Sequence, residues 1–100
     1  MLDYNRIEAK KAAGGLPHSI WETYSAFANT IGGIILLGVE ELPDHSLRPI
    51  HLPKVEQMLN EFWNIINNPN KVSVNILSDK HVQIHEQDGQ RFISITVPRA

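Results

Sequence analysis

One apolar run in the middle of the chain constrains the fold more than any other stretch. Residues 34–39 read IILLGV, with no alternation of apolar and polar side chains. A strand made from such a run needs cover on both faces, as a central strand of a mostly parallel sheet has. Glu40 and Glu41 follow at once, and ligands of open α/β sheets bind at the carboxyl ends of such strands. Residues 21–41 therefore predict a helix, a tight Gly-Gly connection and a central strand.

Apolar residues recur at helical spacing in two other stretches. The first helix is expected to begin near Pro17 or His18, because proline suits a first helical turn, and to stop by about Ile31. The second is expected to run from Lys54 to the turn formed by residues 67–70, with its apolar positions following the i, i+3, i+4, i+7 rule. Residues 42–46 are expected to form a solvent loop, and residues 48–53 to continue it in extended form.

Alternating patterns predict the remaining strands. They are expected at residues 5–10, where Ile7 and Ala9 share the buried side, and at residues 72–77, 82–85 and 91–97. Asp88-Gly89 predicts a tight hairpin turn, because both residues tolerate positive φ. The order is β-α-β-α-β-β-β. It indicates an α/β (α+β) fold, a mixed sheet of about four to five strands with two helices mainly on one face, a parallel first pair and antiparallel final strands.

Composition limits what a chain like this does. One hundred residues suit a single domain, residues 1–100, and the end just after the last strand suggests the N-terminal part of a longer protein. The net charge of −2 counts against strong unaided binding of DNA or RNA. There is no cysteine, no apolar run of membrane-spanning length and no signal segment, so we expect a cytoplasmic protein without a membrane partner.

Carboxylates offer the clearest candidate for catalysis. Asp3, Glu8, Glu40 and Glu41 would converge if the first two strands are neighbours, and such a cluster could hold Mg²⁺ or Mn²⁺ through hard oxygen ligands. The alternative is that they are solvated carboxylates at strand ends and in loops, as most acidic residues are. The histidines show no ligand spacing, so we expect no zinc site and no cofactor apart from the metal of a nuclease.

The pair Gly32-Gly33 resembles neither a P-loop nor a dinucleotide fingerprint. It follows a predicted helix and precedes a strand, which favours glycines that end the helix and let it approach the sheet. Asn29 and Thr30 are expected to satisfy backbone groups in the last turn.

Three cations near the N-terminus are the candidates for nucleic-acid contact: Arg6, Lys10 and Lys11. Phosphate binding scales with the number of phosphates neutralised, so a pair of lysines contributes little by itself. A solvated basic edge is the alternative.

Several of these segments together resemble a known family. The segments Ile7-Glu8-Ala9-Lys10, SAFANTIGG at residues 25–33, the Leu37-Gly38-Val39-Glu40 block and the closing Ile95-Thr96-Val97-Pro98 are similar to the Schlafen-type Alba-like (AlbA_2) domain of bacterial transcriptional regulators. The resemblance implies an Alba-like fold and a DNA-binding role within a larger ATP-binding or winged-helix protein. Some Schlafen relatives cleave RNA through a carboxylate triad, so the resemblance also implies such a triad here. At the matching positions stand Asp3, Glu8 and Glu40 or Glu41, but Ala9 replaces the usual aromatic residue and Glu40 the usual aspartate.

Three functions therefore remain open at the level of sequence. The first is a DNA-binding module that uses Arg6, Lys10 and Lys11. The second is a metal-dependent ribonuclease that uses the carboxylates. The third is a module for homo-oligomerisation, suggested by the near-neutral charge and by Trp63 and Phe92.

Overall fold

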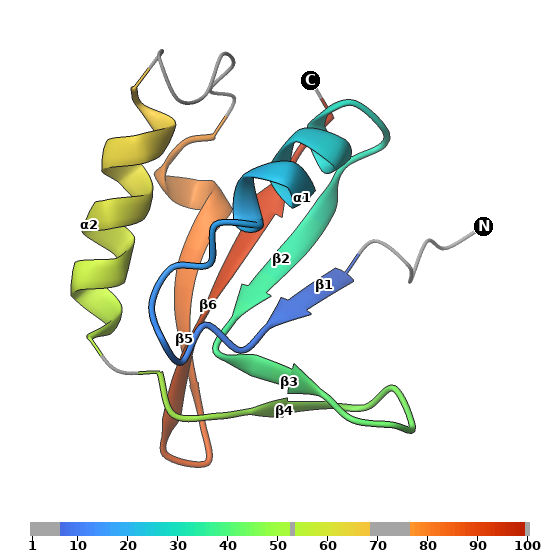
Figure 1. The fold of residues 1–100 in the computed structure, drawn as a ribbon, viewed down its shortest axis with the longest axis vertical. Helices are drawn as coiled ribbons and strands as arrows, with labels where there is room; N and C mark the ends of the chain where they lie inside the picture. Colours follow the sequence, from blue (N-terminus) through green and yellow to red (C-terminus); the bar gives the residue numbers. More distant parts are fainter. Residues whose placement is uncertain (1–6, 53, 69–76, 100) are drawn as a thin grey trace.

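Four strands form one mixed sheet in the order β1-β2-β6-β5 (Figure 1). The computed structural model describes residues 7–52, 54–68 and 77–99. Within them the sheet is built from β1 (Ile7–Lys10), β2 (Gly33–Leu37), β5 (Val82–Gln87) and β6 (Gln90–Val97). Strand β2 pairs in parallel with β1 and antiparallel with β6, and β5 pairs antiparallel with β6. The predicted parallel first pair, antiparallel final strands and central position of the apolar run are confirmed.

The two helices pack on one face of this sheet. Helix α1 (Ile20–Ala28) and helix α2 (Val55–Ile66) bury their apolar sides against Ile35, Ile93 and Ile95, none of which is exposed. Complete burial of such a side chain contributes about 1.5–3 kcal/mol to folding. The helices meet through aromatic rings, since Trp21 stacks on Phe62 at a centroid distance of 5.4 Å.

The opposite face of the sheet corrects two expectations. Ile34 and Leu36 are only half-buried, so the apolar run has helices on one face rather than cover on both. In β1 the register pairs Ile7 with Ile34 and Ala9 with Leu36, on the face away from the helices. Ile7 is 40% exposed. The alternation in β1 was therefore real, but its apolar side is not the helix-covered side, because alternation alone does not tell which face a helix covers.

Helix α1 is shorter than predicted at both ends. Residues 17–19 form a turn in which the Ile20 N–H donates to the Pro17 carbonyl at 3.1 Å, and the helix begins only at Ile20. It ends at Ala28, and Ile31, expected on the buried stripe, is 57% exposed. Helix α2 follows its predicted apolar spacing closely, with Val55, Met58, Phe62 and Ile66 buried.

The connection from α1 to β2 explains both glycines. Gly32 takes φ +90°, and its N–H donates to the Phe27 carbonyl at 2.9 Å, a bond that closes the end of the helix. A Cβ on Gly32 would lie 2.6 Å from the Val97 carbonyl oxygen, and one on Gly33 would lie 2.7 Å from the Phe27 ring. Thr30 Oγ1 donates to the Ala26 carbonyl at 2.8 Å. Asn29 Nδ2 donates to Ser25 Oγ at 3.3 Å.

A second, two-stranded sheet follows β2. Gly38, at φ +87°, separates β2 from β3 (Val39–Glu41), which pairs antiparallel with β4 (Leu47–Pro49). Residues 42–46 form the largely exposed loop that was expected, but the residues on either side of it pair as the two strands of a β-hairpin. Figure 1 shows this hairpin alongside β1, with its loop directed away from both helices. We call residues 39–49 the hairpin arm.

The C-terminal part of the chain agrees with the predicted hairpin. Asp88 and Gly89 both have positive φ, +56° and +78°, and join β5 to β6. A short 3₁₀ turn, η2 (Asp79–His81), leads into β5. Of the strand predicted at residues 72–77, only residue 77 is among the described residues. Asp3, Asn5 and Arg6 also lie outside them. In the ranges that are described, every helix is too short or too polar to span a membrane.

Candidate nucleic-acid interface

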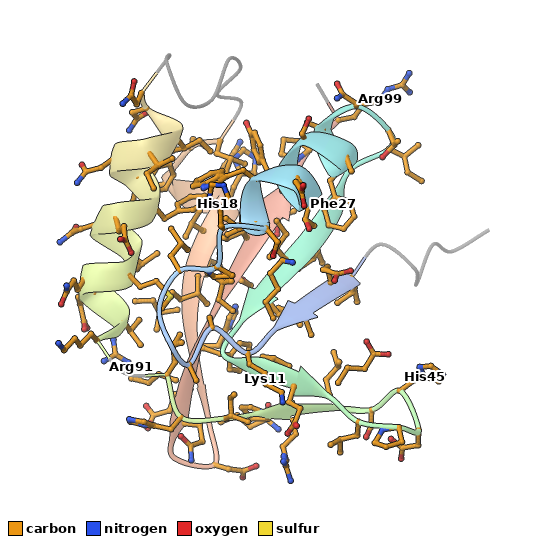
Figure 2. All side chains as sticks on the ribbon, in the orientation of Figure 1. Lys11, His18, Phe27, His45, Arg91 and Arg99 are labelled. Carbon is orange, nitrogen blue, oxygen red and sulfur yellow. The ribbon has the colours of Figure 1, made fainter. Side chains whose placement is uncertain are left out.

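Three charged side chains gather at the base of the hairpin arm. Arg48 Nη2 lies 2.5 Å from Glu40 Oε1, and Lys11 Nζ lies 3.4 Å from Glu40 Oε2. We call Lys11, Glu40 and Arg48 the basic cluster. It joins residues from three places in the chain: the end of β1, strand β3 and strand β4. Figure 2 shows Lys11 beside the two strands of the arm and His45 at the arm's tip.

Backbone pairing explains why these three residues meet. The antiparallel register of the arm sets Glu40 directly opposite Arg48, and residues opposite one another on two strands have side chains close enough to pair. The Gly38 N–H donates to the Lys10 carbonyl at 2.9 Å, which holds the start of β3 beside the end of β1. Lys11 is the next residue, so its side chain reaches Glu40.

The cluster carries a net positive charge. The hydrogen bond from Arg48 lowers the pKa of the Glu40 carboxyl, desolvation opposes this shift, and Lys11 adds to the lowering. Glu40 is therefore ionised at neutral pH, and two cations share one anion. The side chain of Glu40 is 23% exposed, whereas those of Lys11 and Arg48 are 64% and 60% exposed. The anion is thus the more sheltered partner, and both cations offer most of their surface to solvent.

Lys10 has a different environment from its neighbour. Its Nζ donates to Ser19 Oγ at 3.1 Å and so ties the end of β1 to the residue before α1. Lys10 and Lys11 therefore do not form one basic pair, because one lies on the helix side of the sheet and the other at the arm. Arg6, the third predicted cation, lies outside the described residues.

The described carboxylates do not come together. Glu8 is exposed at the edge of the sheet and has no side-chain partner among the described residues. Glu41 Oε2 lies 2.9 Å from His45 Nδ1 in the arm, while Glu40 is engaged by Arg48 and Lys11. Within residues 7–52, 54–68 and 77–99 no group of three His, Cys, Asp or Glu residues is placed to hold a metal ion. A site that includes Asp3 stays a prediction.

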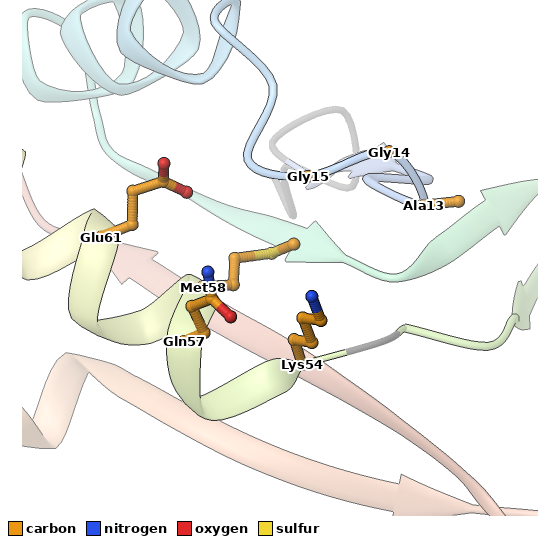
Figure 3. A pocket seen from close by; sticks show the side chains of 7 residues that line it. All are labelled: Ala13, Gly14, Gly15, Lys54, Gln57, Met58 and Glu61. Atoms are coloured by element: carbon orange, nitrogen blue, oxygen red, sulfur yellow. The ribbon is translucent and has the colours of Figure 1, made fainter.

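A cleft lies between the loop after β1 and helix α2 (Figure 3). It has a volume of about 390 Å³, and its lining comprises Ala13, Gly14, Gly15, Lys54, Gln57, Met58 and Glu61. Two of these side chains carry opposite charges, and the loop contributes backbone with little side chain. The cleft is therefore not a cationic site for phosphate.

Arg48 is the residue that sequence reasoning missed. Its partner Glu40 was singled out, but for metal binding rather than as an anion that holds two cations. A hairpin across residues 39–49, with Glu40 and Arg48 at facing positions, was the signal that could have found it.

These features define a class: an α+β domain in which a mixed sheet carries two helices on one face and a β-hairpin arm beyond its first strand. The chain belongs to the Schlafen, AlbA_2 family, which it matches over residues 3–100. The family resemblance inferred from the sequence is confirmed. No curated protein matches the chain significantly.

One solved structure is similar over the whole chain. It is the solution NMR structure of the N-terminal domain of a protein from Nitrosomonas europaea, named as related to the ATP-dependent DNA helicase RecG. The TM-score is 0.72 at 27% sequence identity, and the match covers 100% of this chain and 67% of the other. The comparisons associate the fold with nucleic-acid-related proteins.

Proposed function

We propose that this chain is a DNA-binding module, the N-terminal, cytoplasmic part of a larger bacterial transcriptional regulator, and that Lys11 and Arg48 contact the phosphate backbone. The observation that carries the proposal is the basic cluster. Glu40 holds two mostly exposed cations next to each other on an arm that extends away from the helices. Membership in the AlbA_2 family and the helicase-related neighbour support a nucleic-acid partner.

The geometry favours phosphate over base contacts. A cation whose other side is held by a carboxylate keeps a defined direction, which lowers the entropy lost when it binds an anion. Such contacts fix position on a duplex without reading its sequence. The chain's net charge of −2 means that attraction is local to the arm. We therefore expect weak, salt-sensitive binding with little sequence preference.

Fluorescence anisotropy with labelled duplex DNA, at several salt concentrations, tests the proposal. Each phosphate contact contributes about 0.9 to the slope of log affinity against log salt. Replacing both Lys11 and Arg48 by alanine should lower that slope by about 1.8, equivalent to about tenfold less loss of affinity between ~50 and ~200 mM salt. Lys80→Ala is the matched control, since Lys80 is exposed and has no side-chain partner in the described part of the chain. It should leave the slope unchanged.

Glu40→Gln separates this role from catalysis. The substitution removes a negative charge from the arm, so DNA binding should be retained or strengthened at low salt. If Glu40 served as a metal ligand, the same substitution would instead abolish Mn²⁺-dependent cleavage of structured RNA. The proposal is refuted if duplex DNA fails to bind at low salt, or if the Lys11 and Arg48 double variant binds it like the parent.

A further inference from the structure

The sheet has a face that no function described above uses. It consists of the residues of β1, β2, β5 and β6 that alternate with the helix-covered core, and we call it the open sheet face. Its apolar residues include Ile7, Ile34 and Leu36, which lie together on the paired strands β1 and β2, and Phe92 of β6, which pairs with His85 of β5. Ile7 is 40% exposed and the other three are half-buried. Ile35, Ile93 and Ile95 on the helix side are fully buried.

The open sheet face carries no lysine, arginine, aspartate or glutamate. The four strands contain four such residues, Glu8, Lys10, Glu86 and Arg91, and the register sets all of them on the helix side. Two contacts agree with this, because Lys10 bonds to Ser19 before α1 and Arg91 bonds to Glu56 of α2. The water-facing side of an antiparallel sheet is normally polar. Depletion of charge around an aromatic and aliphatic centre is instead the composition of an interface core.

The polar residues of this face can pair with themselves. Ser94 accepts or donates a hydrogen bond with His85 Nε2 at 2.8 Å, and the His85 ring stacks on Phe92 at 5.1 Å between centroids. Thr96 is exposed and stands beside Ile34 on the neighbouring strand. Hydroxyl, imidazole and amide groups both donate and accept. A second copy of the same face therefore satisfies them without a charged partner.

We infer that the open sheet face binds a second copy of this chain, sheet against sheet about a two-fold axis. In a two-fold dimer each patch meets its own copy, so a charged patch meets like charge, whereas an uncharged one does not. Nucleic acid is disfavoured as the occupant because the face lacks the cations that bind phosphates. Two such faces pack about 10 Å apart with their strands nearly aligned.

The size of the face limits the area that a dimer can bury. Four strands about 4.8 Å apart, with about six residues each at ~3.3 Å per residue, cover about 400 Å² of sheet plane. With the relief of the side chains, two copies would bury on the order of 1,000 Å², the lower end for a specific interface. The expected state is a concentration-dependent equilibrium between monomer and dimer.

Analytical ultracentrifugation of the protein over a wide concentration range tests the inference. The average mass should rise from 11.3 kDa toward twice that value. Ile34→Lys should weaken dimerisation at least tenfold, because two lysines would face each other across the axis. Ile31→Lys is the matched control, since Ile31 is 57% exposed and lies outside the strands; it should dimerise like the parent. Circular dichroism checks that each variant is folded.

Thr96→Lys keeps the test decisive if Ile34→Lys does not fold. Thr96 is exposed, so a lysine there is compatible with the monomer, yet it places the same charge on the same face. A protein that stays monomeric at the highest concentration overturns the inference. A dimer that persists unchanged in Thr96→Lys and in folded Ile34→Lys also overturns it. Neither result bears on Lys11 and Arg48, so the DNA-binding proposal stands or falls separately.

Discussion

The substitution Gly33→Ala tests how closely helix α1 packs on the sheet, through its effect on the free energy of unfolding. An alanine Cβ at this position would lie 2.7 Å from two carbons of the Phe27 ring and 2.8 Å from a third. Ordinary contacts between carbon atoms are about 3.5–4.0 Å, so the ring or the strand would have to move by about 1 Å. Phe27 is 7% exposed and surrounded by core residues. It has little room to move.

The expected cost follows from these distances. Overpacking of a dense core costs about 1–3 kcal/mol. Replacing glycine by alanine also restricts the unfolded chain, which returns about 0.4–1 kcal/mol. Gly33→Ala should therefore lower the free energy of unfolding by about 1–2 kcal/mol, equivalent to a fall in Tm of roughly 4–16 °C for a domain of this size.

Gly14→Ala is the matched control for this experiment. No heavy atom lies within 4 Å of a Cβ built on Gly14, and its φ is not positive. That variant should be unchanged or up to about 1 kcal/mol more stable. Urea unfolding followed by circular dichroism gives both free energies.

Close packing of Phe27 against Gly33 is contradicted if the free energies of unfolding of Gly33→Ala and Gly14→Ala differ by less than about 0.5 kcal/mol, the usual size of a neutral surface change. A double-mutant cycle sharpens the result. Combining Gly33→Ala with Phe27→Leu should cost less than the sum of the two single changes, because the smaller side chain makes room for the methyl group.

Two further predictions concern charge and burial. Because Arg48 holds the pKa of Glu40 below its ordinary value of 4.5, the ionised carboxylate contributes stability that is fully present above that value and is lost as the pH falls through the lowered pKa of the folded state. The stability advantage of the parent over Glu40→Gln should therefore be present at pH 7 and shrink below about pH 4, as measured by urea unfolding. Ile35→Ala should cost about 2–5 kcal/mol because Ile35 is fully buried. Ile34→Ala should cost clearly less, and equal losses would contradict the assignment of the two faces.

Local patterns were sufficient to predict the main elements. Four buried residues at helical spacing predict helix α2. The pair Asp88-Gly89 predicts the turn between β5 and β6. These signals depend on neighbours within one or two turns of the chain, so no knowledge of distant partners is needed. The role of Gly32-Gly33 was accessible for the same reason, since a glycine pair between helix and strand is itself a local signal.

Elements without a strong local sequence signal were missed. Strands β3 and β4 have three residues each, too few to show alternation. They form a hairpin through three residue pairs and through the loop hydrogen bond from the Leu42 N–H to the Ser46 carbonyl. The prediction of which side of β1 is buried was also wrong. The polarity of Ile7 and Ala9 against Glu8 and Lys10 shows that the strand has two different faces, but it does not show which face the helices cover. The candidate site was therefore only partly predicted, because Lys11 was identified from the sequence and Arg48 was not.

The distribution of charge relates the proposed DNA binding to the proposed dimer. Charged residues of the sheet lie on the helix side, and Lys11 and Arg48 lie at the arm, while the open sheet face has none. If two copies pair through that face, the two-fold dimer carries two basic clusters. Two weak phosphate sites on one particle bind a long duplex more tightly than either does alone, because the second contact becomes intramolecular. A domain with a net charge of −2 would then gain DNA affinity from pairing rather than from additional cations.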